Sequence, residues 1–274
     1  MSFGLIPPDE AAIQADLERR FAGLRRLYGD DGYLRLRALR LAVVGLGGVG
    51  SWVAEALARC GVAALVLIDM DHVAESNINR QLQALGSTLG QGKGQALRDR
   101  IADIHPACEV HVVDDFVTPA NWPALLPVAV HGLVDACDQM SAKAALAAWA
   151  LEADVSFVTV GAAGGKRHPQ RVEVDDLAQV THDPLLASLR QRLRRGAAVP
   201  RAGAMGVRCV FSREPVLRPA GPACEPGAPL ACHGYGSSVM VTASFAMSAA
   251  TAVVEDCLTT KRCQVPIPAS GVML

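Results

Sequence analysis

The feature that most constrains this chain is a glycine-rich loop between an apolar run and a helical segment. Residues 39–44 are typical of a buried parallel strand, and residues 51–60 predict a helix that ends at Gly61. Glycines in such a loop let a ligand approach the backbone at the helix start, where a Cβ would fill the ligand's space. The order strand, loop, helix therefore predicts a nucleotide or dinucleotide site. Its glycines are Gly45, Gly47, Gly48 and Gly50.

The same alternation of short apolar runs and helical segments continues along the chain. Strands are expected at 64–68, 109–113, 132–134 and 155–160, and helices at 9–39, 91–104 and 141–153. This order predicts an α/β fold with a doubly wound, mainly parallel sheet of the Rossmann-like type. We expect a single domain over 1–274. Its parts are a nucleotide-binding core at 20–161, an irregular arginine- and proline-rich insertion and crossover at 162–233, and an apolar C-terminal segment at 234–260 that packs on the core.

Composition indicates a folded intracellular protein. Of 274 residues, 51% are hydrophobic and 19% are charged, which favours a buried core over disorder. The eight cysteines form no Cys-x-x-Cys pair, so we expect reduced thiols, a cytoplasmic location and no zinc. The formal net charge is −1, so a polyanionic partner would need a local basic patch.

One apolar stretch, residues 235–254, carries no charged residue and is long enough to cross a bilayer. Its many Gly, Ser, Thr and Ala residues lower its apolar strength, and basic flanking residues are sparse. These features favour a buried core segment, and they leave peripheral contact with a membrane open.

Polar residues after the second and later strands distinguish ATP from a dinucleotide. Asp69 ends the second strand, where a carboxylate can accept hydrogen bonds from ribose hydroxyls of either ligand. Arg80 and Lys93 add two cations, which cleavage between the α and β phosphates of ATP requires. A nicotinamide oxidoreductase leaves both cations without a purpose, and so does a non-catalytic nucleotide-binding scaffold. The remaining alternative is that both are solvated surface charges.

Three further residues complete the predicted site. Asn77 and Gln81 flank Arg80 and offer amide hydrogen bonds to the nucleotide. Asp138 follows the strand at 132–134, where a carboxylate can hold Mg²⁺ by oxygen ligation. Together these residues predict adenylation by ATP, with Arg80, Lys93 and Asp138 as the catalytic set.

As a set, these motifs resemble the ubiquitin-activating-enzyme superfamily of ThiF/MoeB type over residues 20–161. The motifs are Gly-x-Gly-Gly-x-Gly at 45–50, Asp-x-Asp at 69–71, Ser-Asn-x-Asn-Arg-Gln at 76–81, Lys93, and Asp-x-x-Asp at 135–138. The resemblance implies a Rossmann-like adenylation domain that activates a carboxylate with MgATP and releases pyrophosphate, usually as a homodimer. It also assigns Asp69 to the ribose, Arg80 and Lys93 to the phosphates, and Asp138 to the metal.

Within the superfamily, further segments are similar to the tRNA threonylcarbamoyladenosine dehydratase branch. They lie at 114–119, 161–165, 183–190, 209–212 and 240–245. That branch implies ATP-dependent cyclisation of N6-threonylcarbamoyladenosine in tRNA through an acyl-adenylate. The alternative is an adenylyltransferase that activates the C-terminal carboxylate of a ubiquitin-like sulfur-carrier protein. The missing Cys-x-x-Cys pairs count against it, because such enzymes usually carry two that bind zinc.

Eight arginines between residues 190 and 218 stand against one acid, Glu214. Because tRNA is held mainly through its phosphates, this cluster is the first candidate for RNA contact, and the N-terminal arginines are the second. The alternative is an ordinary solvated helix face. The candidate contacts are Arg190, Arg192, Arg194, Arg195 and Arg201.

Two departures from the superfamily pattern leave assignments open. An arginine that often reaches into the partner subunit's ATP site is replaced here by Gly23, and Arg20 or Arg26 could substitute for it. Cys232 lies where a crossover loop would return to the core, so it is a candidate for thiol chemistry. A structural cysteine is the alternative. A thiol role would connect the protein with a cysteine desulfurase and sulfur-acceptor system.

Overall fold

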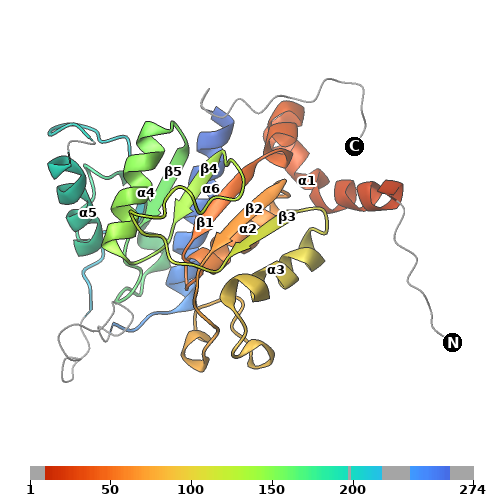
Figure 1. Ribbon diagram of the computed structural model, residues 1–274, viewed down its shortest axis with the longest axis horizontal. Coiled ribbons are helices and arrows are strands. Elements are labelled where there is room, and N and C mark those ends of the chain that lie inside the picture. Colours follow the sequence, from red (N-terminus) through yellow and green to blue (C-terminus); the bar gives the residue numbers. More distant parts are fainter. Residues whose placement is uncertain (1–9, 197–198, 218–234, 260–274) are drawn as a thin grey trace.

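A seven-stranded sheet forms the centre of the protein in a computed structural model that describes residues 10–196, 199–217 and 235–259 (Figure 1). The strand order is β3-β2-β1-β4-β5-β7-β6. The strands are β1 Arg40–Val44, β2 Ala64–Ile68, β3 Glu109–Val113, β4 Gly132–Asp135, β5 Ser156–Val160, β6 Val172–Asp176 and β7 Arg208–Ser212. The helices are α1 Glu10–Arg37, α2 Gly50–Arg59, α3 Lys93–Ile104, α4 Met140–Glu152, α5 Pro184–Arg195 and α6 Val239–Thr259.

All neighbouring strands are parallel except β6, which runs antiparallel to β7. This arrangement confirms the predicted doubly wound, mainly parallel sheet. From β1 the chain continues to β2 and β3 on one side of the sheet, whereas β4 pairs with the other edge of β1 and β5 follows beyond it. The connections after β1 and β4 therefore run in opposite directions and leave a crevice between these two strands. Ligands bind at such a switch point, beyond the carboxyl ends of the strands.

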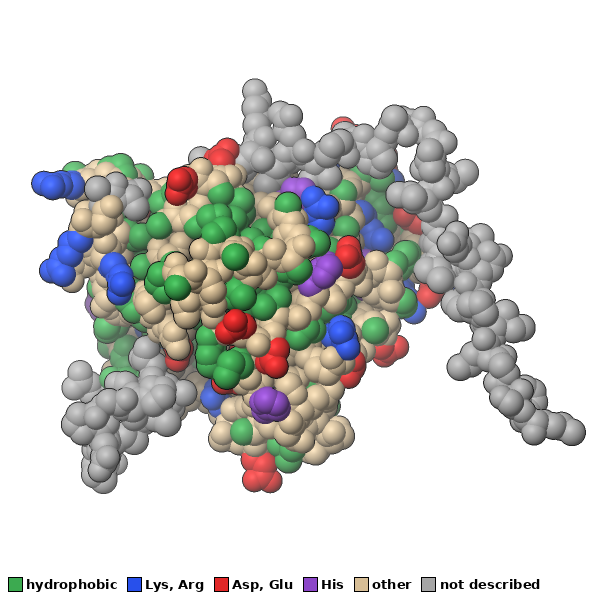
Figure 2. Space-filling view, viewed as in Figure 1, with side chains coloured by type: hydrophobic (Ala, Val, Ile, Leu, Met, Phe, Trp, Pro, Cys, Tyr) green, Lys and Arg blue, Asp and Glu red, His purple; other side chains and the backbone are tan. Residues whose placement is uncertain are grey.

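The segment expected to be an irregular insertion is more ordered than its composition indicated. It contributes β6 and β7, which extend the main sheet, and the helix α5 between them. Lys and Arg side chains gather at the left edge of the molecule in Figure 2, where Figure 1 places α5. The proline-rich part of the crossover at 218–234 lies outside the described residues.

Alternate side chains along each strand pack on opposite faces of the sheet. Leu41 and Val43 of β1 belong to one hydrophobic cluster, with side chains from α2, α3 and α6. Ala42 and Val44 belong to the other, with side chains from α4 and α5. Both faces are therefore covered, which explains why the central strands are continuous hydrophobic runs.

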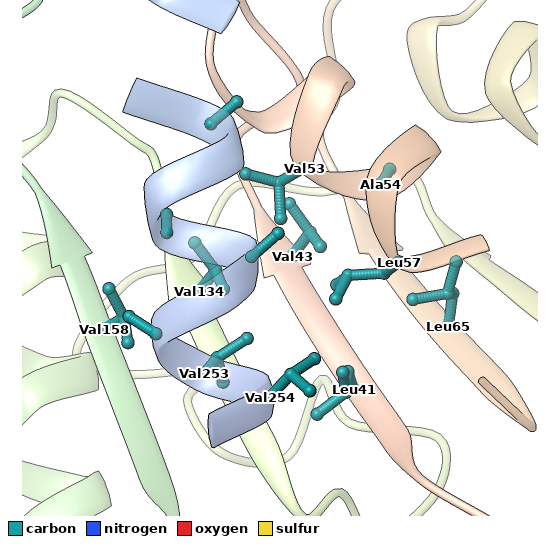
Figure 3. Close-up of a cluster of buried hydrophobic side chains, with 14 of the residues drawn as sticks. Leu41, Val43, Val53, Ala54, Leu57, Leu65, Val134, Val158, Val253 and Val254 are labelled. Atoms are coloured by element: carbon teal, nitrogen blue, oxygen red, sulfur yellow. The ribbon is translucent and has the colours of Figure 1, made fainter. Parts of the chain in front are cut away.

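Helix α6 is apolar and long enough to cross a membrane, the one such helix among the described residues. Its side chains pack on β1, β4 and β5 beside α2 (Figure 3). Phe245 and Val253 are fully buried. The fit to the sheet is close, because a Cβ on Gly132 of β4 would lie 2.8 Å from Cγ2 of Val253. The helix thus has the packing of a core helix.

Candidate nucleotide site

A cavity of about 1500 Å³ lies at the carboxyl ends of the central strands, at the switch point between β1 and β4. Its walls come from the loops after β1, β2, β4 and β5, and from residues just before α6. The structure brings nearly all predicted site residues to this cavity. They are Gly45, Gly47, Gly48, Asp69, Asn77, Arg80, Gln81, Lys93 and Asp138.

The glycine loop needs its glycines for three different reasons. Gly45 has a φ of +84°, and a Cβ there would lie 2.9 Å from the Cα of Cys137. Gly50 does not line the cavity but supports the loop, since a Cβ there would lie 1.8 Å from the carbonyl oxygen of Gly45. Gly47 lines the cavity, and a Cβ there would have no atom of the described residues within 4 Å. The loop therefore combines a tight turn with room for a ligand at the start of α2.

Asp69 fixes the shape of this loop from the end of β2. Its Oδ2 accepts a hydrogen bond from the backbone N–H of Leu46 at 2.6 Å, and its Oδ1 accepts one from Asp71 at 2.8 Å. Burial raises the pKa of Asp69, and the nearby charge of Lys93 opposes this rise. Gln83, which the sequence patterns did not single out, holds the same loop by donating to the Leu46 carbonyl at 2.9 Å.

The two predicted cations lie on different walls and differ in burial. Lys93, the first residue of α3, is only 6% exposed, so the alternative of a solvated surface charge is wrong for it. Its Nζ lies 2.6 Å from Oδ2 of Asp71 and 3.9 Å from Oδ1 of Asp69. Arg80 is half-buried, and its Nη1 donates to the Ser76 carbonyl at 2.7 Å and to Asn79 Oδ1 at 3.0 Å. Arg80 lines the cavity while these two bonds hold its guanidinium group.

The side-chain amides of Asn77 and Gln81, on either side of Arg80, form hydrogen bonds within the protein through their oxygens. Asn77 Oδ1 accepts from the backbone N–H of Ala74 at 3.1 Å, and Gln81 Oε1 accepts from Gln83 Nε2 at 3.3 Å. Their predicted contacts with a nucleotide therefore depend on the amide NH₂ groups, which neither of these two hydrogen bonds uses. Asn79 donates to the Ser237 carbonyl at 2.9 Å and so ties this run to the residues before α6.

Asp138 is an exposed side chain on the cavity wall, and a buried ion pair supports its loop from below. Asp135, at the end of β4, accepts hydrogen bonds from Lys143 Nζ at 2.9 Å and from Thr159 Oγ1 at 2.7 Å. It also accepts from the backbone N–H of Cys137 at 3.2 Å. Asp135 and Lys143 are both fully buried. Lys143 was missed by the sequence patterns, although a lone lysine in the alanine-rich start of α4 was an available signal.

The wall beyond β5 is fixed by Asp183, the N-cap of α5. Its Oδ1 accepts from the N–H of Leu186 at 3.0 Å, and its Oδ2 accepts from the N–H of Ala162 at 2.8 Å. A Cβ on Gly161 would lie 2.1 Å from that Oδ2, so a glycine is needed there. The start of α5 is thus anchored to the cavity, and Leu185 lines it.

The sequence left two assignments open: the arginine that reaches a partner subunit's ATP site, and the role of Cys232. Arg20 holds the end of α3 through bonds from its Nη1 to the carbonyls of Asp103 and Ile104, both at 2.9 Å. Gly23 and Arg26 are exposed on α1, and neither lines the cavity. Cys232 lies outside the described residues.

The fold and cavity define a nucleotide-binding protein with a Rossmann-like sheet. A family model described as the ThiF family matches residues 18–266, and the chain belongs to this family. This result confirms the resemblance found in the motifs.

Relatives similar over most of their length are tRNA threonylcarbamoyladenosine dehydratases. The Haemophilus influenzae protein is 38% identical over 249 residues, covering 89% of this chain and 95% of the relative. The Escherichia coli protein is 42% identical over 238 residues, covering 83% and 89%. A crystal structure of E. coli tRNA N6-threonylcarbamoyladenosine dehydratase, TcdA, in complex with ATP has a TM-score of 0.80 at 40% identity, covering 92% of this chain and 96% of that one.

Proposed function

We infer that this protein uses ATP to dehydrate, and thereby cyclise, N6-threonylcarbamoyladenosine in tRNA. One observation carries the inference: a single cavity gathers the glycine loop, Arg80, Lys93 and Asp138 in a chain that aligns along nearly its whole length with such dehydratases. The relative from E. coli has been solved with ATP and with AMP, the substrate and a product of adenylation.

The chemistry has two steps. A carboxylate oxygen of the threonyl group attacks the α-phosphorus of ATP, and the bond to pyrophosphate breaks. Arg80 and Lys93 are suited to neutralise the charge that develops on the phosphates, Arg80 as a planar fork and Lys93 as a buried point charge. Lys93 enters this step already oriented by Asp71, at 2.6 Å.

In the second step the urea-like group on the same side chain attacks the activated acyl carbon. AMP leaves with the original carboxylate oxygen, a proton is lost from the attacking group, and a ring closes. The nucleoside therefore loses one water in total, while ATP becomes AMP and pyrophosphate. Because both reacting groups belong to one side chain, proximity supplies much of the rate, and a thioester with the enzyme is not required.

The residues around Asp138 fit a Mg²⁺ ion held jointly with the phosphates. Mg²⁺ typically uses one or two carboxylates plus phosphate oxygens and waters, and Asp138 offers one exposed carboxylate at the cavity wall. No group of three or more His, Cys, Asp or Glu residues in the described ranges is placed to form a complete metal site. When bound, the ion supplies charge stabilisation on the phosphates. Asp69 would face the ribose, since each of its oxygens keeps a lone pair beyond its bond to the backbone.

The competing sulfur-carrier adenylyltransferase would use the same ATP cavity. The dehydratase relatives align over nearly the whole chain, including the segments outside the nucleotide-binding core, and this favours the dehydratase. A cytoplasmic location accords with a tRNA substrate. The homodimer and a link to a cysteine desulfurase stay predictions from the family resemblance.

Pyrophosphate exchange into ATP in the presence of threonylcarbamoyladenosine-bearing tRNA tests the site. We expect Arg80→Ala and Asp138→Ala to abolish exchange while the far-ultraviolet circular dichroism spectrum stays that of the wild type. Arg98→Ala, an exposed side chain on the outer part of α3, serves as the matched control. Wild-type exchange in either site variant would remove that residue from the mechanism.

A further inference from the structure

A second depression, of about 770 Å³, lies on α5 and is lined by four arginines. They are Arg190, Arg194 and Arg195 of α5 and Arg201 from the segment that follows. None of the described residues that line this depression is acidic. It is separate from the ATP cavity, and the adenylation chemistry leaves it without a role.

The sequence of α5 explains why the arginines gather there. Leu186, Leu189 and Leu193 recur at helical spacing and are buried against the sheet. Of the arginines on the rest of the helix, Arg192 and Arg195 are exposed, and Arg190 and Arg194 are partly buried. Arg190 is held in place because its Nη1 donates to the carbonyls of Leu177 and Val180, at 3.2 and 2.7 Å.

The predicted arginine cluster separates into two groups with different roles. Arg208 pairs with Asp256, and Arg213 pairs with Glu173 at 2.8 Å, so both charges are balanced within the protein. Arg194, Arg195 and Arg201 have no ion pair among the described residues. The Nε of Arg194 is even buried without a hydrogen-bond partner in that part of the chain. These three cations are therefore available to an anion.

Helix α5 connects this depression with the ATP cavity. Leu185 lines the cavity, and the depression begins at Ala187 on the same helix; Arg194, nine residues after Leu185, lies about 14 Å further along at a rise of 1.5 Å per residue. Asp183 fixes the start of the helix to the cavity wall through Ala162 at 2.8 Å. The separation matches a few nucleotides at roughly 3.4 Å per stacked nucleotide. Figure 2 shows that the basic side chains over α5 face solvent.

We propose that this arginine depression binds backbone phosphates of the substrate RNA, a few nucleotides from the adenosine that enters the ATP cavity. The naming of the RNA as tRNA rests on the proposed function. Arginine forks recognise phosphate oxygens in pairs, and a protein with a net charge of −1 needs such a concentrated site to hold a polyanion. If these arginines were only an ordinary solvated helix face, there would be no reason for arginines from two separate segments to line one depression. Arg192 is exposed on α5 but does not line the depression, so its contribution is smaller.

The test is the affinity of fluorescently labelled, threonylcarbamoyladenosine-bearing tRNA for the full chain, measured by anisotropy at several salt concentrations. Arg194→Gln/Arg201→Gln should raise the Kd about tenfold and lower the slope of log Kd against log salt by about one per arginine. Binding of ATP should not change, and excess tRNA should restore turnover. Arg195→Gln/Arg201→Gln gives the same test if the first pair folds poorly.

The matched control is Arg40→Gln/Arg98→Gln, which removes two exposed arginines from β1 and α3 that belong to neither candidate group for RNA contact. The proposal is overturned if the depression variants bind RNA with the wild-type Kd and salt slope, or if the control weakens binding equally. Because binding is measured without turnover, failure of the proposed function is a separate result. In that case the wild-type protein binds this tRNA but leaves its nucleoside unchanged.

Discussion

Replacing Lys143 by methionine would test the buried ion pair beneath the Asp138 loop. At 2.9 Å and an effective dielectric constant of about 20, the attraction between Lys143 Nζ and Asp135 Oδ2 is about 6 kcal/mol before desolvation. Burial acts to lower the pKa of Lys143, but the charge of Asp135 outweighs it and the pKa is raised, so the lysine stays charged. Desolvation of both groups offsets most of the attraction.

Removing only the lysine leaves Asp135 buried without a counter-charge, which costs about 3–5 kcal/mol of unfolding free energy. Asp135 also positions the backbone of Cys137, next to Asp138, so we expect turnover to fall about 100-fold as well. Denaturant unfolding measures the first effect, and nucleoside conversion measures the second. Asp135→Asn/Lys143→Met should recover at least half of the lost stability, because no unpaired charge remains.

The exposed pair between Arg213 and Glu173 provides the control, and Arg213→Met should cost less than about 1 kcal/mol. A Lys143→Met protein that loses less than about 1 kcal/mol of unfolding free energy and turns over like the wild type would show that the buried ion pair does not support the Asp138 loop. So would a double variant as unstable as the sum of the two single variants.

Three further predictions follow from local geometry. Gly47→Ala should keep the wild-type unfolding free energy but bind ATP more weakly in calorimetry, because the added Cβ would take up space in the cavity. Gly50→Ala should weaken ATP binding and also lower the unfolding free energy, because its Cβ would collide with the Gly45 carbonyl oxygen. Phe245→Ala should cost about 3–5 kcal/mol in denaturant unfolding, and the exposed Met247→Ala on the same helix less than about 0.5; equal effects would contradict a core role for α6. Burial, with Arg37 nearby, lowers the pKa of His105 from 6.5 to about 4, so the unfolded state binds this proton first. As the pH falls from 7.5 to 5, His105 should therefore reduce the free energy of unfolding by about 2 kcal/mol. A His105→Phe protein whose unfolding free energy falls as steeply with pH would contradict this role of His105.

The sequence motifs predicted the site where its residues are close in sequence or end a strand. The glycine loop is one uninterrupted segment, and Asp69 and Asp138 follow apolar runs whose carboxyl ends meet at one edge of a parallel sheet. Position along such strands determines position in space, so these residues could be placed without knowledge of the packing.

Residues that act through contacts between distant segments could not be found in this way. Lys143 and Thr159 meet Asp135 only after β4, α4 and β5 have packed. Asp183 reaches Ala162 from 21 residues further along the chain, with β6 between them. Within the insertion, arginines and acids concealed the periodicity of β6 and α5. The helical spacing of the buried leucines in α5 was nevertheless an available signal.

The proposed dehydration can be observed by mass spectrometry of nucleosides from threonylcarbamoyladenosine-bearing tRNA after incubation with the protein, ATP and Mg²⁺. We expect that nucleoside to lose one water in a reaction that depends on ATP and releases AMP and pyrophosphate. The loss should be absent with Arg80→Ala and present with Arg98→Ala. An unchanged nucleoside, with ATP bound but not consumed, would contradict the proposed dehydration.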